Sequence, residues 1–127
     1  MIVEFRIDRC REHRHLGMDL REGLRANPRS FEILFELGAL YAENNRDVPR
    51  ARAILELSVQ RWIEQEARKP EPDTLAYGQI LALLADLEER TGNLERSLTH
   101  LFRLKQVSPA PERIQKSIDE ITAKLKR

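Results

Sequence analysis

Three residues near the start of the chain are of types that bind metal ions or act as nucleophiles. They form the pattern Cys10-x2-His13-x-His15, which could offer thiolate and imidazole ligands to zinc or pair a thiol with an imidazole base. A structural zinc site needs about four ligands, and no fourth one follows nearby. On one helix, His13 and His15 would also lie about 200° apart. We therefore expect these residues to be structural, with no metal, no cofactor and no catalytic role.

The other residues with reactive or charged side chains are scattered. His100 is alone on an expected helix, and we interpret it as a surface residue. Two acidic runs, Glu88-Glu89 and the pair Glu64 and Glu66, are typical of solvated helix faces. The five glycines are isolated from one another, so no glycine-rich phosphate loop is predicted. No nucleophile is paired with a base at a turn, and we expect a protein that is not an enzyme.

Composition indicates a protein with a core and a heavily solvated surface. Hydrophobic residues make up 41% of the 127 residues and charged residues 34%, with a formal net charge of +1. A nucleic-acid-binding domain is usually much more basic, so a nucleic-acid partner is not expected from the overall charge. Only the segment from Arg96 to Arg127 leans basic. The chain length fits one domain, residues 1–127.

The cysteine content and the hydropathy of the chain predict the cellular compartment of the protein. Cys10 is the only cysteine, so no internal disulfide can form. The first ten residues hold four charged side chains and no apolar run of the secretory type. No stretch approaches the ~20 apolar residues of a membrane-spanning helix. We expect a soluble, cytoplasmic protein with no membrane partner, although the sequence could also be a segment of a longer chain.

Helices must position all of these residues, because apolar residues recur with helical spacing and strand alternation is absent. The expected helices cover residues 4–26, 29–44, 48–68, 73–91, 94–106 and 111–126. Helix starts are indicated by Asp47 and Asn93 as N-caps and by prolines in first turns, and Gly92 indicates a left-handed helix stop. The connections are tight turns, which favour antiparallel neighbours.

Two pairs of helices carry matching patterns of large and small residues. The first helix of a pair reads Leu34-x2-Leu37-Gly38-x2-Tyr41, which is echoed by Leu81-x2-Leu84-Ala85-x2-Glu88. The second helix reads Ala51-x3-Leu55-x2-Ser58, which is echoed by Ser97-x3-Leu101-x2-Leu104. Small residues at fixed places allow two helix backbones to approach closely. The patterns therefore predict two antiparallel helical hairpins.

These patterns resemble the tetratricopeptide repeat (TPR) family, whose repeats carry Leu-Gly and Tyr on the first helix and Ala on the second. The resemblance implies an all-α, short right-handed TPR-like solenoid of about six helices. Residues 29–62 would be the best repeat, 78–109 a degenerate repeat, 11–28 a partial repeat and 111–126 a capping helix. Leu37 and Leu84 are 47 residues apart, whereas the family repeats at ~34. We therefore expect an elongated third helix and a bend near residues 61–74. The stretch from Asp47 to Glu56 also resembles the half-TPR repeats of RNA-processing scaffolds.

The resemblance also implies a concave groove lined by the first helix of each repeat. The expected groove is mostly acidic, with Phe35 as an apolar anchor, and it would accept a basic or apolar peptide or helix. We therefore expect a non-catalytic scaffold that binds a protein or peptide partner. The predicted partner-binding residues are Glu32, Phe35, Ala39, Glu43, Gln79, Ala82, Asp86 and Glu89.

Two alternatives to groove binding involve the C-terminal part of the chain. Its basic residues could associate with RNA, in which case binding should weaken steeply with salt. Its last helix could also pair with a second copy of the chain, because Ile114, Ile118 and Ile121 would be only half covered at the end of an array. The second alternative predicts a homo-oligomer through terminal helices.

Overall fold

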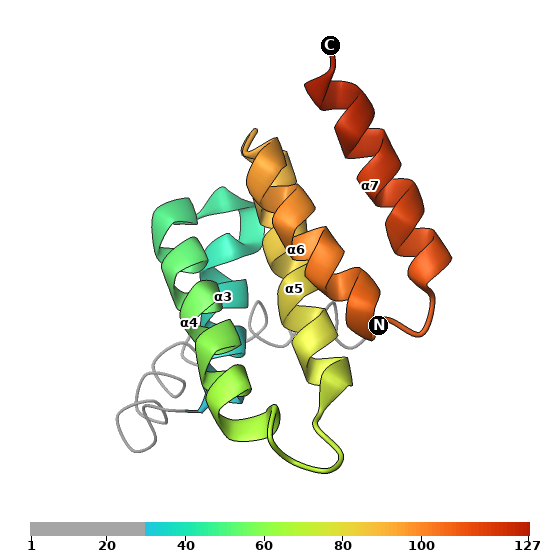
Figure 1. Ribbon diagram of the computed structural model, residues 1–127. Coiled ribbons are helices and arrows are strands. Elements are labelled where there is room, and N and C mark those ends of the chain that lie inside the picture. Colours follow the sequence, from blue (N-terminus) through green and yellow to red (C-terminus); the bar gives the residue numbers. More distant parts are fainter. Residues whose placement is uncertain (1–29) are drawn as a thin grey trace. The chain divides into compact units, whose positions relative to one another are not determined.

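The computed structural model describes residues 30–127, which are helical over 82% of their length and contain no strand. The elements are α3 (Phe31–Ala42), the 3-10 turn η1 (Glu43–Asn45), α4 (Val48–Glu66), α5 (Thr74–Arg90), α6 (Leu94–Val107) and α7 (Pro111–Leu125) (Figure 1). The all-α class is confirmed. Five α-helices are described where about six are predicted. The expected helix over 4–26, the partial repeat over 11–28 and the Cys10/His13/His15 cluster lie outside the described residues.

The chain divides into two compact units between Pro72 and Asp73, where the sequence predicts a single domain. In the described part, the first unit contains α3, η1 and α4, and the second contains α5, α6 and α7. The division falls inside the Lys69–Asp73 segment, whose two prolines, Pro70 and Pro72, disfavour a continuous helix. The stacking of repeats into a solenoid stays a prediction.

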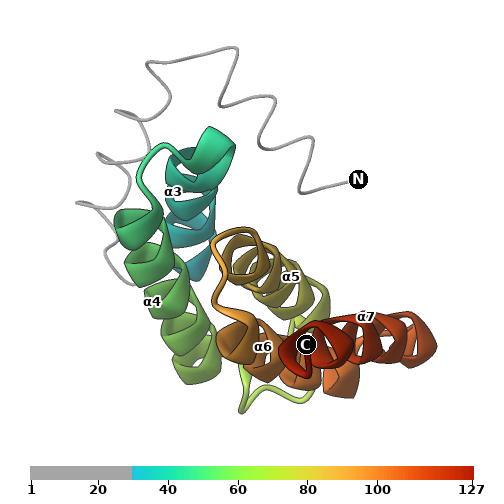
Figure 2. The same ribbon diagram turned by 90° about the horizontal axis from the view of Figure 1, so that it is seen from above.

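The first unit is a hairpin of two antiparallel helices (Figure 2). The Ser30 hydroxyl accepts a hydrogen bond from the Ile33 amide at 3.2 Å and caps α3. Asp47 caps α4 by accepting from the Arg50 amide at 3.3 Å, as its sequence position predicts. Between the helices, Asn44 and Asn45 both adopt positive φ angles of 54° and 53°. Asparagine tolerates this left-handed conformation better than most residues, so the two asparagines reverse the chain here.

The helices of the first hairpin approach each other at a glycine. A Cβ atom added to Gly38 would lie 2.7 Å from both Cγ and Cδ2 of Leu55, so no larger residue fits without movement. Ala51 is fully buried on α4, and the Ser58 hydroxyl donates a buried hydrogen bond to the Phe31 carbonyl at 2.7 Å. The predicted packing role of the small residues is therefore confirmed in this hairpin. At 19 residues α4 is also longer than α3, with 12, as the repeat spacing predicts.

The second unit begins with another antiparallel hairpin, formed by α5 and α6. Asp73 caps α5 by accepting from the Ala76 amide at 3.0 Å. Gly92, with a φ of 85°, follows the end of α5 as expected. Asn93 occupies the N-cap position of α6 but makes no side-chain capping hydrogen bond. The Ser97 hydroxyl donates to the buried Ala85 carbonyl at 2.8 Å, so small residues again mark the helix–helix contact.

The last helix, α7, packs against α6. Lys124 of α7 forms an ion pair with Glu89 of α5 at 2.9 Å, and Lys105 of α6 donates to the Gln115 side chain. Ile118 and Ile121 are buried and Ile114 is half-buried. The expectation that all three would be half covered is therefore wrong for two of them, because this unit covers its own terminal helix. No helix among the described residues combines the length and apolar character that a membrane span requires.

Candidate functional site

The predicted groove residues of the first unit are divided between the surface and the core. Glu32 is exposed and Glu43 is half-buried. Phe35 and Ala39 are only 2% and 1% exposed. Phe35 is thus a core residue in this structure and does not stand on the surface as an apolar anchor. Only the two glutamates remain as surface groups from this set.

The predicted groove residues of the second unit lie on one side of α5. Gln79, Ala82, Asp86 and Glu89 follow one another at intervals of three or four residues, which places them on one helix face. Ala82 and Asp86 are exposed, whereas Gln79 and Glu89 are half-buried. We refer to these four residues as the α5 face.

Both carboxylates of the α5 face are engaged by basic side chains. Arg90 lies 2.9 Å from the Asp86 carboxylate, one helical turn along α5. Lys124 lies 2.9 Å from the Glu89 carboxylate and comes from α7. Exposed ion pairs contribute only about 0–1 kcal/mol each, so either cation can be exchanged at little cost. The α5 face is therefore less acidic than its sequence indicates.

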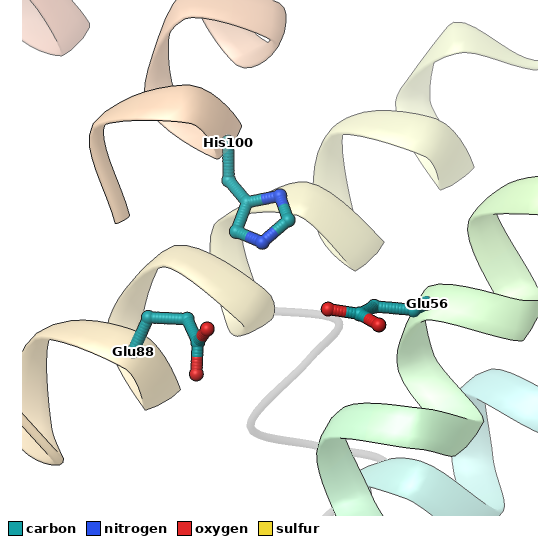
Figure 3. Close-up of side chains that lie close together, drawn as sticks. All are labelled: Glu56, Glu88 and His100. Carbon is teal, nitrogen blue, oxygen red and sulfur yellow. The ribbon is translucent and has the colours of Figure 1, made fainter. Parts of the chain in front are cut away.

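A second group of polar residues lies inside the second unit. Glu88 of α5 is fully buried and His100 of α6 is 8% exposed. Figure 3 shows the two side chains projecting from their respective helices; Glu56, also labelled there, is an exposed residue of α4 in the first unit. The interpretation of Glu88 as part of a solvated run and of His100 as a surface residue is therefore wrong.

The buried pair is close enough for direct interaction. A carboxylate oxygen of Glu88 and a ring nitrogen of His100 lie within 4.8 Å of each other. Arg96 of α6 approaches the same carboxylate at 3.8 Å, and its own side chain is 62% exposed. His100 Nδ1 is buried and makes no hydrogen bond to the described part of the chain. A charged form of either buried side chain is therefore poorly solvated.

The protonation of His100 follows from this environment. Burial lowers the pKa of His100, because the charged imidazolium loses its hydration. The negative charge of Glu88 acts in the opposite direction, and the positive charges of Arg103 and Arg96 lower the pKa further. The imidazole is consequently neutral near pH 7 and retains one nitrogen lone pair. A neutral imidazole beside a carboxylate can hold a cation or share a proton.

Helical periodicity contains the signal that places these two residues inside. Glu88 continues the apolar series Leu81, Leu84 at helical spacing and occupies the position where the TPR pattern has Tyr. His100 follows Ser97 by three residues and precedes Leu104 by four. The polarity of the two side chains indicates the surface, whereas their positions along the helices indicate the core. Glu66, which is also expected on a solvated face, is buried and forms an ion pair with Lys69, while Glu64 is exposed as expected.

The basic residues of the C-terminal helix do not form a uniform patch. Arg113 and Lys116 are exposed on α7, but so are Glu112, Asp119 and Glu120. Lys124 is engaged with Glu89. Phosphate backbones favour dense clusters of Lys and Arg, and the exposed side of α7 alternates in sign.

Known proteins give no indication of the function, so it must be inferred from the geometry described above. No protein-family model, no curated protein and no solved structure matches the chain.

Proposed function

We propose that this protein is a non-catalytic, TPR-like interaction module that binds a protein or peptide partner through the exposed acidic sides of its hairpins. The observation that carries the proposal is the α5 face, which presents Ala82 and Asp86 to solvent beside the half-buried Gln79 and Glu89. Leu81, Leu84 and Leu87 are buried elsewhere on the same helix. The residues of the α5 face are therefore not needed for the core, and they are available to a partner.

The chemistry of the α5 face favours a segment that carries Lys or Arg. Asp86 and Glu89 are held only by surface ion pairs with Arg90 and Lys124. A partner cation can replace Arg90 or Lys124 with little net loss, because exposed pairs are weak. Ala82 has a small side chain, which allows a bound backbone or helix to approach α5 closely. Such a surface gives specificity through charge complementarity.

Packing inside the hairpins supports the likeness to TPR repeats. In the first hairpin Gly38 of α3 abuts Leu55 of α4, and in the second the Ala85 carbonyl of α5 accepts a hydrogen bond from Ser97 of α6. Both contacts join the small-residue position of a first helix to the facing second helix. Repeat proteins of this type usually expose their first helices to ligands. We accordingly assign partner binding to α5 and to Glu32 on α3.

Charge reversal with a matched control tests the proposal. The full-length chain is used to capture partners from the cells that produce it, alongside Asp86→Lys/Glu89→Lys and Glu112→Lys/Glu120→Lys variants. Both variants change the net charge equally, but the second lies on α7. We expect the first variant to lose about tenfold or more of the captured partner, because like charges would then oppose each other. We expect the α7 variant to retain it.

Two results would contradict the assignment. If both variants retain the partner, the α5 face does not bind it. If both lose the partner to the same extent, overall charge matters and the face does not. Circular dichroism on each variant ensures that a loss is not caused by unfolding, and Glu32→Lys tests the contribution of the first unit separately.

A further inference from the structure

We propose that Glu88 and His100 bind a divalent transition-metal ion, with zinc as the best match, between α5 and α6. This site is separate from the α5 face and does not depend on the proposed partner binding. One side chain supplies a carboxylate oxygen and the other an imidazole nitrogen, which are ordinary ligands of zinc.

The distance between the ligand atoms is suitable for a shared ion. The two atoms lie within 4.8 Å of each other. Zinc binds both ligand types at about 2.0–2.2 Å, so two ligands of one tetrahedral ion are roughly 3.5 Å apart. Small rotations of the two side chains are enough to close this difference. Because Glu88 and His100 come from packed antiparallel helices, the backbone does not need to move.

His100 is the residue that points most directly to a ligand. Its side chain is more than nine-tenths buried, and Nδ1 makes no hydrogen bond to the described part of the chain. In Figure 3 the ring nitrogen nearer the Glu88 carboxylate is Nε2, so Nε2 would be the ligand atom and Nδ1 would carry the proton of the neutral imidazole. The lowered pKa keeps the imidazole neutral near pH 7, which is the state that coordinates metals.

The positive charge of Arg96 lowers the affinity that we expect of this site for a metal ion. Its guanidinium lies 3.8 Å from the Glu88 carboxylate, but the side chain is 62% exposed. A bound divalent ion would repel Arg96 into solvent, where the guanidinium is well hydrated. The remaining coordination positions would be open to water or to a partner's side chain, since a zinc ion takes about four ligands. We therefore expect weaker binding than at a structural zinc site.

The test uses the full-length chain with Cys10→Ser, His13→Gln and His15→Gln substitutions, which remove the other clustered ligand-type residues. Zinc chloride is titrated into this background protein by calorimetry, and cobalt chloride is titrated with visible absorption as a second readout. We expect saturable binding of one ion per chain. Substitution of either ligand, Glu88→Gln or His100→Gln, should weaken it by at least about tenfold, because even indirect supporting residues give 10- to 100-fold effects.

Glu95→Gln is the matched control, because it removes an exposed carboxylate from α6 and should leave metal binding unchanged. The ring-nitrogen NMR shifts of His100 provide a readout that does not depend on a variant's folding, and zinc should move them while magnesium should not. The proposal is overturned if the background protein binds no zinc. It is also overturned if His100→Gln binds zinc as tightly as the background, or if zinc leaves the His100 ring shifts unchanged.

Discussion

Replacing Gly38 by alanine should destabilise the first hairpin, although alanine is the better helix former. In a helix interior, Gly→Ala is worth about 1 kcal/mol of stabilisation. At this position the new methyl group would lie 2.7 Å from both Cγ and Cδ2 of Leu55, and 3.4 Å from Cγ2 of Ile54. The two effects oppose each other, so the sign of the result depends on whether Leu55 can move.

The surroundings of Leu55 indicate that it cannot move freely. Its side chain is fully buried, and one of the colliding atoms is Cγ, which shifts only when the whole side chain changes rotamer. Overpacking of a filled core costs about 1–3 kcal/mol, and this site belongs to the upper half of that range. After subtraction of the gain in helix propensity, Gly38→Ala should lower the free energy of unfolding by about 1–2 kcal/mol.

Two further variants make the experiment decisive. Gly78→Ala is the same chemical change inside α5, where the new methyl group would meet only Leu104 Cδ1 at 3.4 Å, so it should stabilise by up to about 1 kcal/mol. In a Leu55→Ala background the colliding atoms are absent, and Gly38→Ala should then become stabilising as well. Contacting residues are expected to show such non-additivity.

Urea unfolding followed by the fluorescence of Trp62 measures these changes, because Trp62 is the only tryptophan and lies buried in α4. Far-UV circular dichroism follows Gly78→Ala, which belongs to the second unit. The reasoning is refuted if Gly38→Ala alone stabilises the protein as much as Gly78→Ala does. It is also refuted if the effect of Gly38→Ala is the same with and without Leu55.

Three other predictions follow from the second unit. Ser97→Ala removes the buried hydrogen bond to the Ala85 carbonyl and should cost about 0.5–1.5 kcal/mol by chemical denaturation, since that carbonyl lies inside α5 and keeps the backbone hydrogen bond of its own helix; an unchanged stability would contradict this. The folded-state pKa of His100 is lowered, so the free energy of unfolding should fall as the pH drops below about 6.5 and stop falling below the folded pKa; His100→Gln should lose this component of the pH dependence. Lys124→Ala should lower stability by less than about 1 kcal/mol at low salt and by still less at high salt, because its ion pair with Glu89 is exposed; a larger loss would show that α7 depends on this ion pair.

The all-α class and most helix ends could be predicted from the sequence, because they depend on the local pattern of apolar, capping and turn residues. Asp47 caps α4, Gly92 has the positive φ of a helix stop, and Pro111 opens α7, as their positions predict. Packing of Gly38 and Ala51 could also be predicted, because the spacing of small residues reflects how closely two helices approach. The stacking of successive hairpins could not be predicted in the same way, because no local sequence pattern encodes it.

The sites were harder to predict because residue type and helix position gave conflicting signals. Phe35 was expected at a binding surface from the TPR pattern, but its 2% exposure makes it part of the core. Glu88 and His100 were expected in solvent from their polarity, yet both occupy positions on buried helix stripes. In each case burial is a property of packed helices, and a single sequence shows only the periodicity of one helix at a time.

The most direct test of the proposed function is an NMR titration of the isotope-labelled full-length chain with the partner that it captures. Backbone amide shifts should change around Ala82 and Asp86 on α5 and around Glu32 on α3, and the Asp86→Lys/Glu89→Lys variant should suppress the changes on α5. If the shifts change only on α4, α6 or α7, the partner binds elsewhere and the α5 face is not its binding surface.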